Sequence, residues 1–244
     1  MRVGLIQFDI AWQDRKANKS KIEKILKHIK SIDWLIFPEM ALTGFSMDSK
    51  FTEMQAGDLA FFQNLAVKYK AFISFGGVKN KKNCLITLNK SGEIINKYAK
   101  NHLFSYANED KFYKAGKNTK PFKLGDYSIT PTICYDLRFA PLYWAQAKKT
   151  DIYLNIANWP ASRAKHWEAL LKARAIENQA YIIGVNRVGK DPDLAYPGKS
   201  MIIGPQGETL LEIGSREGCF LYDFPKEKLV KEVRKEYPFL KDRV

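Results

Sequence analysis

A cysteine stands between a predicted strand and a predicted helix in the stretch ITPTICYDLRFAPLYW, which begins at residue 129. Its β-branched, apolar start predicts a buried strand over 127–133. The apolar spacing after Cys134 is typical of a helix, which Asp136 can cap. At such a corner, free N–H groups at the helix start stabilise anions, including a thiolate. A free cysteine is also commonly a small buried hydrophobe, so this stretch alone leaves both interpretations open.

Two charged residues follow other predicted strands. Glu39 comes after the apolar run 34–37, and Lys100 comes after residues 93–99. A nucleophilic thiol needs a nearby base or cation. Glu39 can take the thiol proton and pass a proton to a leaving amine, while Lys100 can stabilise the negative charge of a tetrahedral intermediate. Glutamates and lysines are plentiful here and a surface loop is the alternative for each, so spacing alone does not select this trio.

Strands and helices alternate along the chain. The spacing of apolar residues predicts helices around 22–29 and over 58–69, 165–180 and 226–236, and strands over 2–8, 34–37, 71–78, 84–89, 93–99, 121–124, 127–133, 151–156, 181–186, 199–203, 208–213 and 218–223. Strands at this density, some joined by tight turns and some by helices, indicate a mixed sheet in an α/β domain. Residues 105–120 lack periodicity, and irregular loops of this length are usually functional.

Two finer predictions concern the helices. Asn18 is predicted to cap the first helix, because a short polar side chain before an apolar face is typical of a helix start. In the helix over 165–180, a face of small residues is expected to pack closely on a sheet. That face consists of Ala169, Ala173, Ile176 and Ala180.

The composition limits the class of protein. With 244 residues, 45% of them hydrophobic, the chain can bury one large core, and we expect a single domain over residues 1–244. The N-terminal run MRVGLIQFDI predicts a strand and not a signal peptide, and no apolar run approaches the roughly 20 residues of a membrane span. We therefore expect a cytoplasmic protein that does not bind membranes. Three scattered cysteines, Cys84, Cys134 and Cys219, argue against disulfides and against a zinc site.

The net charge of +14 is a property that many nucleic-acid-binding proteins share. The lysines, however, are dispersed in short groups, and no pattern of a nucleic-acid-binding fold accompanies them. A solvated basic surface that attracts anionic small molecules is the favoured interpretation, so nucleic acid is not an expected partner. A basic nucleic-acid-binding protein, recognised by steeply salt-dependent binding, is the alternative from another functional class.

Three segments, in this order, resemble the signature segments of the carbon–nitrogen hydrolase (nitrilase) superfamily. They are FPEMALTGF around Glu39, KYAKNHLF around Lys100 and TICYDLRFAPLYW around Cys134. The resemblance covers nearly the whole chain and implies that these three residues are the catalytic set. It also implies an α/β fold, a four-layer α-β-β-α sandwich with two mixed sheets packed face to face, that forms a homodimer through the helices flanking the cysteine and the long helix of the C-terminal half.

A narrower resemblance concerns HLFSYANEDKFYKAG, IIGPQGE and the stretch from NIANWPASR to GVNRVG, which are similar to the omega-amidase branch of that superfamily. The branch hydrolyses 2-oxoglutaramate and 2-oxosuccinamate to the 2-oxo acid and ammonia. Members of the superfamily often carry a second active-site glutamate after the lysine, and Glu109 is the matching position. The resemblance implies that Glu109 orients Lys100 or the substrate amide; a solvated loop glutamate is the alternative.

An omega-amidase must also hold a substrate carboxylate, and the planar fork of arginine suits this task. Arg138 and Arg163 are the candidates, although Arg138 can instead brace the helix start through an ion pair. Trp159 is expected to wall the pocket unless it is a core residue, and the backbone N–H of Tyr135 to bind the oxyanion. No metal-ligand cluster and no Gly-rich phosphate loop is visible in the sequence, so neither a metal nor a cofactor is expected.

The sequence thus predicts a cofactor-independent amidase that works through a cysteine thioester on a small amide bearing a carboxylate. An N-carbamoyl amine or amino-acid amidohydrolase is the alternative within the superfamily. It would use the same trio, but it would release carbon dioxide as well as ammonia.

Overall fold

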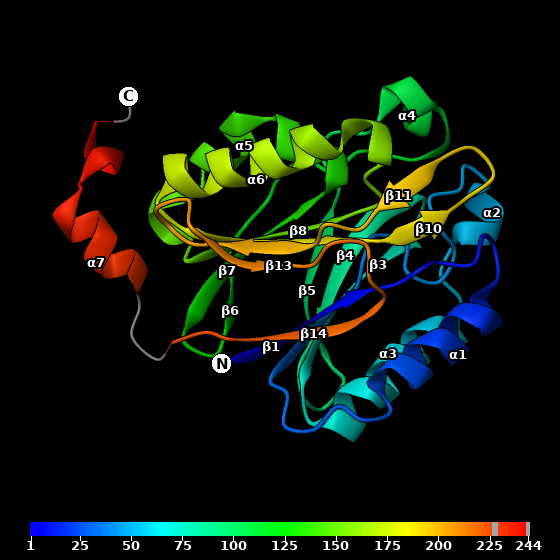
Figure 1. The fold of residues 1–244 in the computed structure, drawn as a ribbon. Coiled ribbons are helices and arrows are strands. Elements are labelled where there is room, and N and C mark those ends of the chain that lie inside the picture. The colour runs from blue at the N-terminus through cyan, green and yellow to red at the C-terminus, as the bar shows by residue number, and fades with distance from the viewer. Residues whose placement is uncertain (226–228, 243–244) are drawn as a thin grey trace.

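Two six-stranded β-sheets lie face to face between two layers of helices (Figure 1). The computed structural model describes residues 1–225 and 229–242. The first sheet has the strand order β14-β1-β2-β3-β4-β5, and the second has the order β13-β12-β9-β8-β7-β6. Parallel and antiparallel neighbours occur in both sheets, which confirms the predicted α-β-β-α sandwich of two mixed sheets.

The strands follow the predicted ranges closely, with one exception. Their bounds are β1 Arg2–Gln7, β2 Trp34–Ile36, β3 Phe72–Lys79, β4 Lys82–Leu88, β5 Ile94–Ala99, β6 Phe122–Leu124, β7 Tyr127–Ile133, β8 Ile152–Ala157, β9 Tyr181–Asn186, β10 Val188–Lys190, β11 Ala195–Pro197, β12 Met201–Ile203, β13 Thr209–Glu212 and β14 Gly218–Asp223. The exception is the separate two-stranded ladder of β10 and β11, which the sequence did not predict. These strands are too short for a period-2 pattern to reveal them.

Helices cover the outer faces of the two sheets and also lie at the ends of the sandwich. They are α1 Arg15–Leu26, α2 Ser49–Thr52, α3 Ala56–Tyr69, α4 Glu109–Phe112, α5 Ala140–Trp144, α6 Ala164–Asn178 and α7 Leu229–Glu236, with 3₁₀ turns η1 Ser105–Ala107, η2 Cys134–Arg138, η3 Ala147–Lys149, η4 Ala161–Arg163 and η5 Phe239–Lys241. α1 and α3 pack on the first sheet, and α5 and α6 on the second (Figure 1). Residues 226–228 of the predicted last helix lie outside the described residues.

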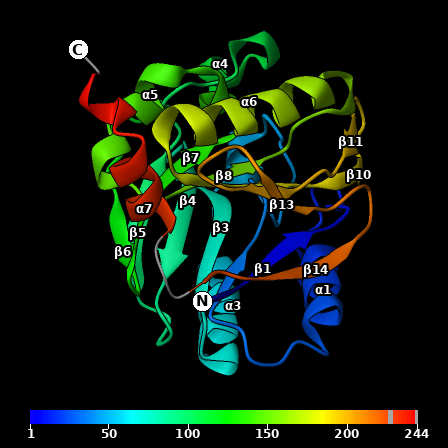
Figure 2. The same cartoon turned by 60° about the vertical axis from the view of Figure 1, so that its left-hand side comes forward.

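The two ends of the sandwich carry different elements. α7 lies at one end and the β10–β11 ladder at the other, as both views show (Figures 1 and 2). Arg234 on α7 donates hydrogen bonds to the backbone oxygens of Thr150, Asn178 and Gln179, so α7 is held against the end of α6. Among the helices in the described part of the chain, none is long and apolar enough to cross a bilayer.

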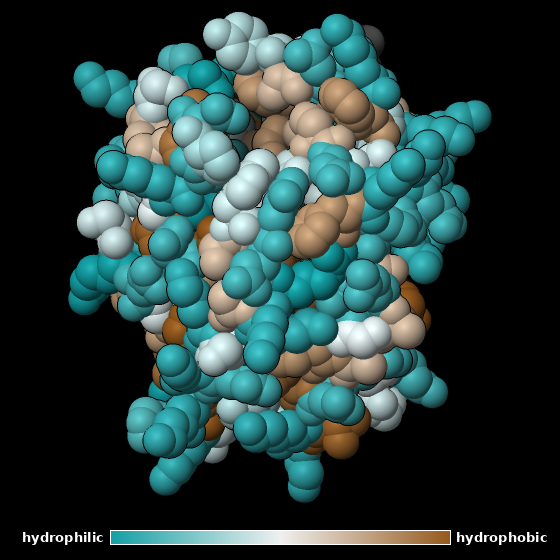
Figure 3. Space-filling view, turned by 90° about the vertical axis from the view of Figure 1, so that its right-hand side faces the viewer, coloured by the Kyte–Doolittle hydropathy of each residue, from teal (hydrophilic) through white to brown (hydrophobic). Residues whose placement is uncertain are grey.

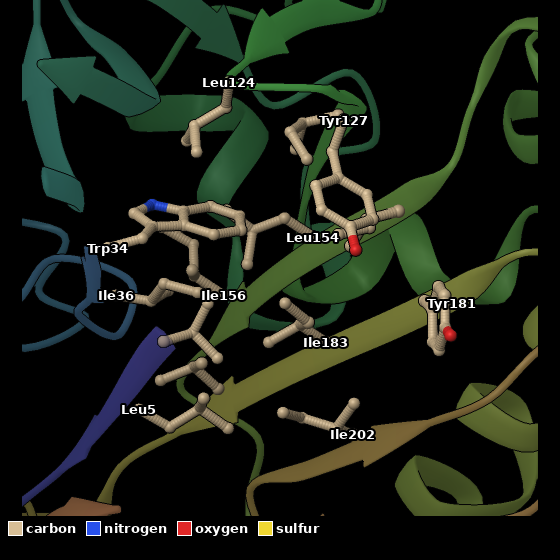
Figure 4. Close-up of a cluster of buried hydrophobic side chains, with 14 of the residues drawn as sticks. Leu5, Trp34, Ile36, Leu124, Tyr127, Leu154, Ile156, Tyr181, Ile183 and Ile202 are labelled. Carbon is tan, nitrogen blue, oxygen red and sulfur yellow. The ribbon is translucent and has the colours of Figure 1, made fainter. Parts of the chain in front are cut away.

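The main core lies between the two sheets. Leu5 and Trp34 of the first sheet face Leu154 and Ile183 of the second, and all four are fully buried (Figure 4). Burying one such side chain contributes about 1.5–3 kcal/mol. The central strands β1, β2 and β3, like β7, β8 and β9, are parallel and apolar on both faces, because helices cover the faces that point away from this core. The space between the sheets is therefore filled by buried apolar side chains.

The prediction for the start of α1 was wrong by one turn. Asp14 is the N-cap, and its side chain accepts a hydrogen bond from Ala17 N. Asn18 is instead a buried helical residue whose Nδ2 donates to Leu42 O at 2.9 Å. Both residue types favour caps, and only the packing of the helix against residues 40–44 decides which one is buried.

The predicted sheet-facing side of α6 was also wrong. Ala169 is exposed, Ile176 is 53% exposed and Ala173 is half-buried; Ala180 is buried, but it lies beyond the end of the helix. Trp167 and Leu171 are buried instead. The sheet has room for these large side chains because β9 carries Gly184, where a Cβ would lie 2.6 Å from Leu171 Cδ1 and 2.7 Å from Trp167 Cζ2. The large side chains that pack into the space above Gly184 thus orient this helix. Close packing of small residues on a flat sheet does not.

Gly76 on β3 lets the chain after β2 approach closely. A Cβ at this position would lie 2.5 Å from both Glu39 Cα and Met40 N, and Gly76 O accepts a hydrogen bond from Ala41 N at 3.1 Å. Distances under about 3.0 Å to backbone atoms cannot be relieved by turning a side chain. The path of the chain at Glu39 therefore depends on this glycine.

We expect Gly76→Ala to lower the free energy of unfolding by about 1–3 kcal/mol, the usual cost of overpacking, and to displace Glu39. Urea denaturation measures the first effect. Gly57→Ala is the matched control, because a Cβ at Gly57 in α3 meets no atom within 4 Å, and alanine favours a helix over glycine by up to about 1 kcal/mol. Equal stabilities of the two variants would contradict this account of Gly76.

Candidate active site

Cys134 stands at a sharp corner where β7 of the second sheet ends. Its φ of +46° is left-handed, a conformation that costs a non-glycine residue about 1–3 kcal/mol. Asp136 stabilises the corner, since its Oδ2 accepts hydrogen bonds from Ile133 N at 3.0 Å and from Tyr98 Oη at 2.6 Å. The capping role predicted for Asp136 is confirmed, although a 3₁₀ turn, η2, comes before the α-helix α5.

Glu39 and Lys100 come from the first sheet and meet at the side of the sheet where β2 and β5 end. Glu39 follows β2, and Lys100 follows β5. β3, β4 and β5 are antiparallel neighbours, so β5 runs in the same direction as β2 and ends at the same side of the sheet. Both side chains are fully buried, and Lys100 Nζ lies 3.0 Å from Glu39 Oε1. A direct ion pair therefore joins two segments that are 61 residues apart.

Glu109 is part of the same cluster. The segment expected as an irregular loop, 105–120, contains η1 and α4, and Glu109 begins α4. Its side chain is fully buried, so a solvated loop glutamate was the wrong alternative. Glu109 Oε2 lies 2.9 Å from Lys100 Nζ and accepts a hydrogen bond from Phe104 N at 2.6 Å. Burial alone would lower the pKa of Lys100, but the charges of Glu109 and Glu39 outweigh it and raise the pKa, so the ammonium stays charged.

Two asparagines that the sequence analysis did not single out hold Glu39. Asn83 on β4 donates to Glu39 Oε1 at 2.7 Å. Asn158, which follows β8, donates from its backbone N–H to Glu39 Oε2 at 2.8 Å and from Nδ2 to Glu39 O at 2.7 Å. Asn158 thus ties the second sheet to the carboxylate of the first. Local sequence held no signal for either asparagine beyond a polar residue in or after an apolar strand.

The Cys134 thiol lies near this cluster, and its surroundings disfavour the loss of its proton. Its Sγ lies 4.0 Å from Asn158 O. Burial raises the pKa of Cys134 well above its ordinary value, the charge of Glu39 raises it further, and Lys100 offsets only part of the increase. At neutral pH the sulfur therefore carries its proton, and a base must remove it before the sulfur can attack a carbonyl carbon.

A cavity of about 370 Å³ opens beside Cys134, and Tyr135, Arg138, Trp159 and Arg163 all line it. Most of its other lining side chains are apolar or aromatic and include Trp12, Phe45, Met47, Phe104 and Leu194. Figure 3 views the molecule from the end where α4 and the β10–β11 ladder lie, and apolar side chains gather on the upper part of this face. The size and lining of the cavity suit a small molecule.

The two arginines differ in their surroundings. Arg138 Nη2 lies 3.1 Å from His166 Nδ1, and its guanidinium carbon lies 5.0 Å from the centre of the Trp159 ring. The guanidinium of Arg163 lies 5.4 Å from the Phe104 ring. Within residues 1–225 and 229–242, neither arginine forms an ion pair, so the bracing ion pair considered for Arg138 is not found there. Both charges remain available to an anionic ligand.

Trp159 serves both of the roles that the sequence left open. It lines the cavity, and with 2% of its surface exposed it also packs against Trp167 in the core under α6. Its ring N–H donates to Arg163 O at 2.8 Å. This contact links the wall of the cavity to the backbone that carries Arg163. In the described part of the chain, no group of three or more His, Cys, Asp or Glu side chains is placed to hold a metal ion.

Comparison with known proteins agrees with this geometry. The family model for carbon-nitrogen hydrolase matches residues 2–227. The chain is 32% identical to the omega-amidase YafV of Escherichia coli K12, over 99% of this chain and 96% of that protein. It is also 32% identical to a 2-oxoglutaramate amidase of Bacillus subtilis, over 98% of this chain and 96% of that protein. The structure of a CN-hydrolase superfamily protein from Xanthomonas campestris superposes with a TM-score of 0.94 at 30% identity and covers 100% of this chain and 97% of that one. The chain belongs to the carbon–nitrogen hydrolase family.

Proposed function

We propose that this protein hydrolyses the terminal amide of a small substrate that bears a carboxylate, such as 2-oxoglutaramate or 2-oxosuccinamate, to the acid and ammonia. The observation that carries the proposal is the cavity beside Cys134, which combines apolar walls with two guanidinium groups and is backed by the buried Glu39–Lys100–Glu109 cluster. The Escherichia coli and Bacillus subtilis relatives are named omega-amidase and 2-oxoglutaramate amidase, which supports this choice of substrate.

In the first half of the proposed reaction, Glu39 takes the proton from the Cys134 thiol, and the sulfur attacks the amide carbon. The carbonyl oxygen becomes an oxyanion, which the Lys100 ammonium and the backbone N–H of Tyr135 stabilise. The intermediate then collapses, the carbon–nitrogen bond breaks, and ammonia leaves with the proton that Glu39 had taken. A thioester between Cys134 and the acyl group remains.

In the second half, Glu39 removes a proton from water, and the resulting hydroxide attacks the thioester carbon. Collapse of this second intermediate breaks the carbon–sulfur bond, and Glu39 returns the proton to the sulfur. One carboxylate thus acts as base, acid, base and acid in turn. Glu109 keeps Lys100 charged and directed at the reacting oxygen, because their atoms lie 2.9 Å apart and both side chains are fully buried.

Arg138 and Arg163 are the proposed partners of the substrate carboxylate. A guanidinium can bind a carboxylate through two parallel hydrogen bonds, and both groups face the cavity without an ion pair among the described residues. The aromatic rings beside them, Trp159 and Phe104, keep the guanidinium planes in place.

We also propose that the chain, as a single domain, acts as a homodimer in the cytoplasm. Trp144 on α5 is 48% exposed, and Ile176 on α6 is 53% exposed. These helices form the outer layer next to the cysteine-bearing sheet, and large exposed apolar side chains on such a layer favour contact with a second copy.

The proposed function predicts ammonia release from 2-oxoglutaramate and 2-oxosuccinamate, and little from glutamine, asparagine or N-carbamoyl amino acids. Cys134→Ala should abolish this release, by about 10⁴-fold or more, with unchanged urea denaturation. Cys219→Ala is the matched control, since this cysteine does not line the cavity. Release of both carbon dioxide and ammonia from N-carbamoyl compounds, with the 2-oxo amides untouched, would assign the protein to the alternative activity. Wild-type turnover by Cys134→Ala would rule out the mechanism.

Removing the anchoring arginine should weaken binding of charged substrates selectively. Of the variants Arg138→Met and Arg163→Met, the one that removes the arginine bound to the substrate carboxylate should raise KM for 2-oxoglutaramate by about tenfold to a hundredfold. Losing one or two charge-assisted hydrogen bonds has an effect of this size. Turnover of a neutral linear amide should change little. Arg216→Met, outside the cavity, is the control. Equal losses on charged and neutral amides would show that the arginines only support the fold.

The Glu39→Gln variant should separate two effects of this carboxylate on Cys134: its action as the base and the effect of its negative charge on the pKa of the thiol. Turnover should fall by about 10²–10⁴-fold because the base is lost. The pKa of Cys134 should also fall, because a negative carboxylate near the sulfur opposes the thiolate and glutamine does not. The measurement is the rate of Cys134 alkylation by iodoacetamide against pH, whose midpoint should move to lower pH. The exposed Glu93→Gln is the control; an unchanged midpoint in Glu39→Gln would contradict the electrostatic account.

A further inference from the structure

Asn83 occupies a position at the centre of the charged cluster. It lies on β4 directly beside Lys100, whose backbone N–H donates to Asn83 O at 2.8 Å. Its side-chain Nδ2 donates to Glu39 Oε1 at 2.7 Å and to Glu109 Oε1 at 3.0 Å. Lys100 Nζ contacts the same two oxygens, at 3.0 and 3.2 Å. The amide and the ammonium thus form a closed ring of contacts with two carboxylates.

The charge balance of the cluster explains why a neutral donor is needed there. Glu39, Glu109 and Lys100 are each fully buried, and two carboxylates against one ammonium leave one negative charge without a balancing cation. An uncompensated buried charge is costly, and a carboxyl group in such a place tends to take up a proton. Hydrogen bonds to the ionised form oppose this. Asn83 supplies such bonds to both carboxylates at once.

Only one orientation of the Asn83 side-chain amide is compatible with its hydrogen-bond partners. Turning it over would place Oδ1 against two carboxylate oxygens, which have no hydrogen to donate. In the orientation observed, Oδ1 is buried and has no hydrogen-bond partner among the described residues. A buried acceptor without a partner is itself unfavourable. The fold therefore accepts this cost at Oδ1 to keep both amide hydrogens on the glutamates.

We propose that Asn83 is a positioning residue that holds Glu39 in place as the base and compensates the second negative charge of the cluster, by donating its two amide hydrogens to Glu39 and Glu109. The inference rests on the proposed amidase function. Asn83 acts through the two glutamates, because both hydrogens of its side-chain amide are donated to them. The titratable groups that face Glu39 are Lys100, Glu109, Cys134, Tyr113 and Tyr196. Burial raises the pKa of both tyrosines, to about 12 for Tyr113, so neither changes charge near neutral pH.

The test compares Asn83→Ala with Asn155→Ala. Asn155 is a matched control because it is also fully buried on a strand and also has an Oδ1 without a partner among the described residues, but its Nδ2 donates to the neutral hydroxyls of Thr132 and Tyr143. In Asn83→Ala, kcat for 2-oxoglutaramate should fall by roughly tenfold to a hundredfold, with KM nearly unchanged. The acid limb of the pH–rate profile should move to higher pH by about one unit, because losing the donors favours the protonated carboxyl. Asn155→Ala should lose stability but keep the wild-type acid limb.

A second measurement does not depend on activity. The amide hydrogens of Asn83 bind ionised carboxylates more strongly than protonated ones. The difference between the urea midpoints of wild type and Asn83→Ala should therefore be larger at about pH 7 than at about pH 5. The corresponding gap for Asn155→Ala should be the same at both values. If Asn83→Ala does not fold, Asn83→Ser, whose hydroxyl cannot bridge both glutamates, is measured in the same way.

The outcomes distinguish this inference from the proposed function. An active wild type, together with an Asn83 variant that keeps the wild-type acid limb, would overturn the role of Asn83 and leave the function intact. A wild type that releases ammonia from no amide would overturn the function. The pH dependence of the urea gap then decides whether Asn83 supports the ionised glutamates: a widening gap supports the inference, and a constant gap overturns it.

Discussion

A fully buried ammonium between two fully buried carboxylates is the constraint on which this structure depends. Moving each of these ions from water into the protein costs several kcal/mol, and only close, correctly directed partners offset that cost. Lys100 has such partners at 3.0 Å in Glu39 and at 2.9 Å in Glu109. They come from the ends of two strands and the start of a short helix, so the charged cluster can exist only when those three segments are already packed together. Catalytic geometry and folding are thereby coupled.

The two sheets contribute different halves of the chemistry. The first sheet supplies Glu39 and Lys100, the proposed acid–base residue and oxyanion partner, and the second supplies the thiol at a strained corner. Asn158 joins them by donating to Glu39 from the end of β8. The carboxylate that raises the pKa of Cys134 is also the proposed base for its proton. A thiol that keeps its proton is a weak nucleophile, so the proposed reaction of Cys134 depends on that base.

The cavity lies beside the charged cluster, and its lining favours the binding of small anions. Its walls are largely apolar or aromatic. Its charged lining groups are two guanidinium groups that lie beside aromatic rings and two carboxylates, Asp191 and Asp193. Because apolar walls strengthen electrostatic attraction, a small anion gains more from these arginines than it would on the open surface. The chain as a whole is also basic, with a net charge of +14, which favours the approach of anionic substrates from solution.

The sequence by itself determined the alternation of strands and helices, the strand before Cys134 and the corner capped by Asp136, which depend on periodicity, β-branched residues and turn chemistry within a few residues of each other. The family followed separately, from the resemblance of three segments to its signature segments. Only the tertiary structure decided that Glu109 is buried, that Asn83 bridges two glutamates, that Asp14 and not Asn18 caps α1, and that Trp167 and Leu171 turn α6 toward Gly184. The reason is physical: charge compensation, hydrogen-bond partners and packing grooves come from segments far apart in the chain, and local spacing carries no record of them.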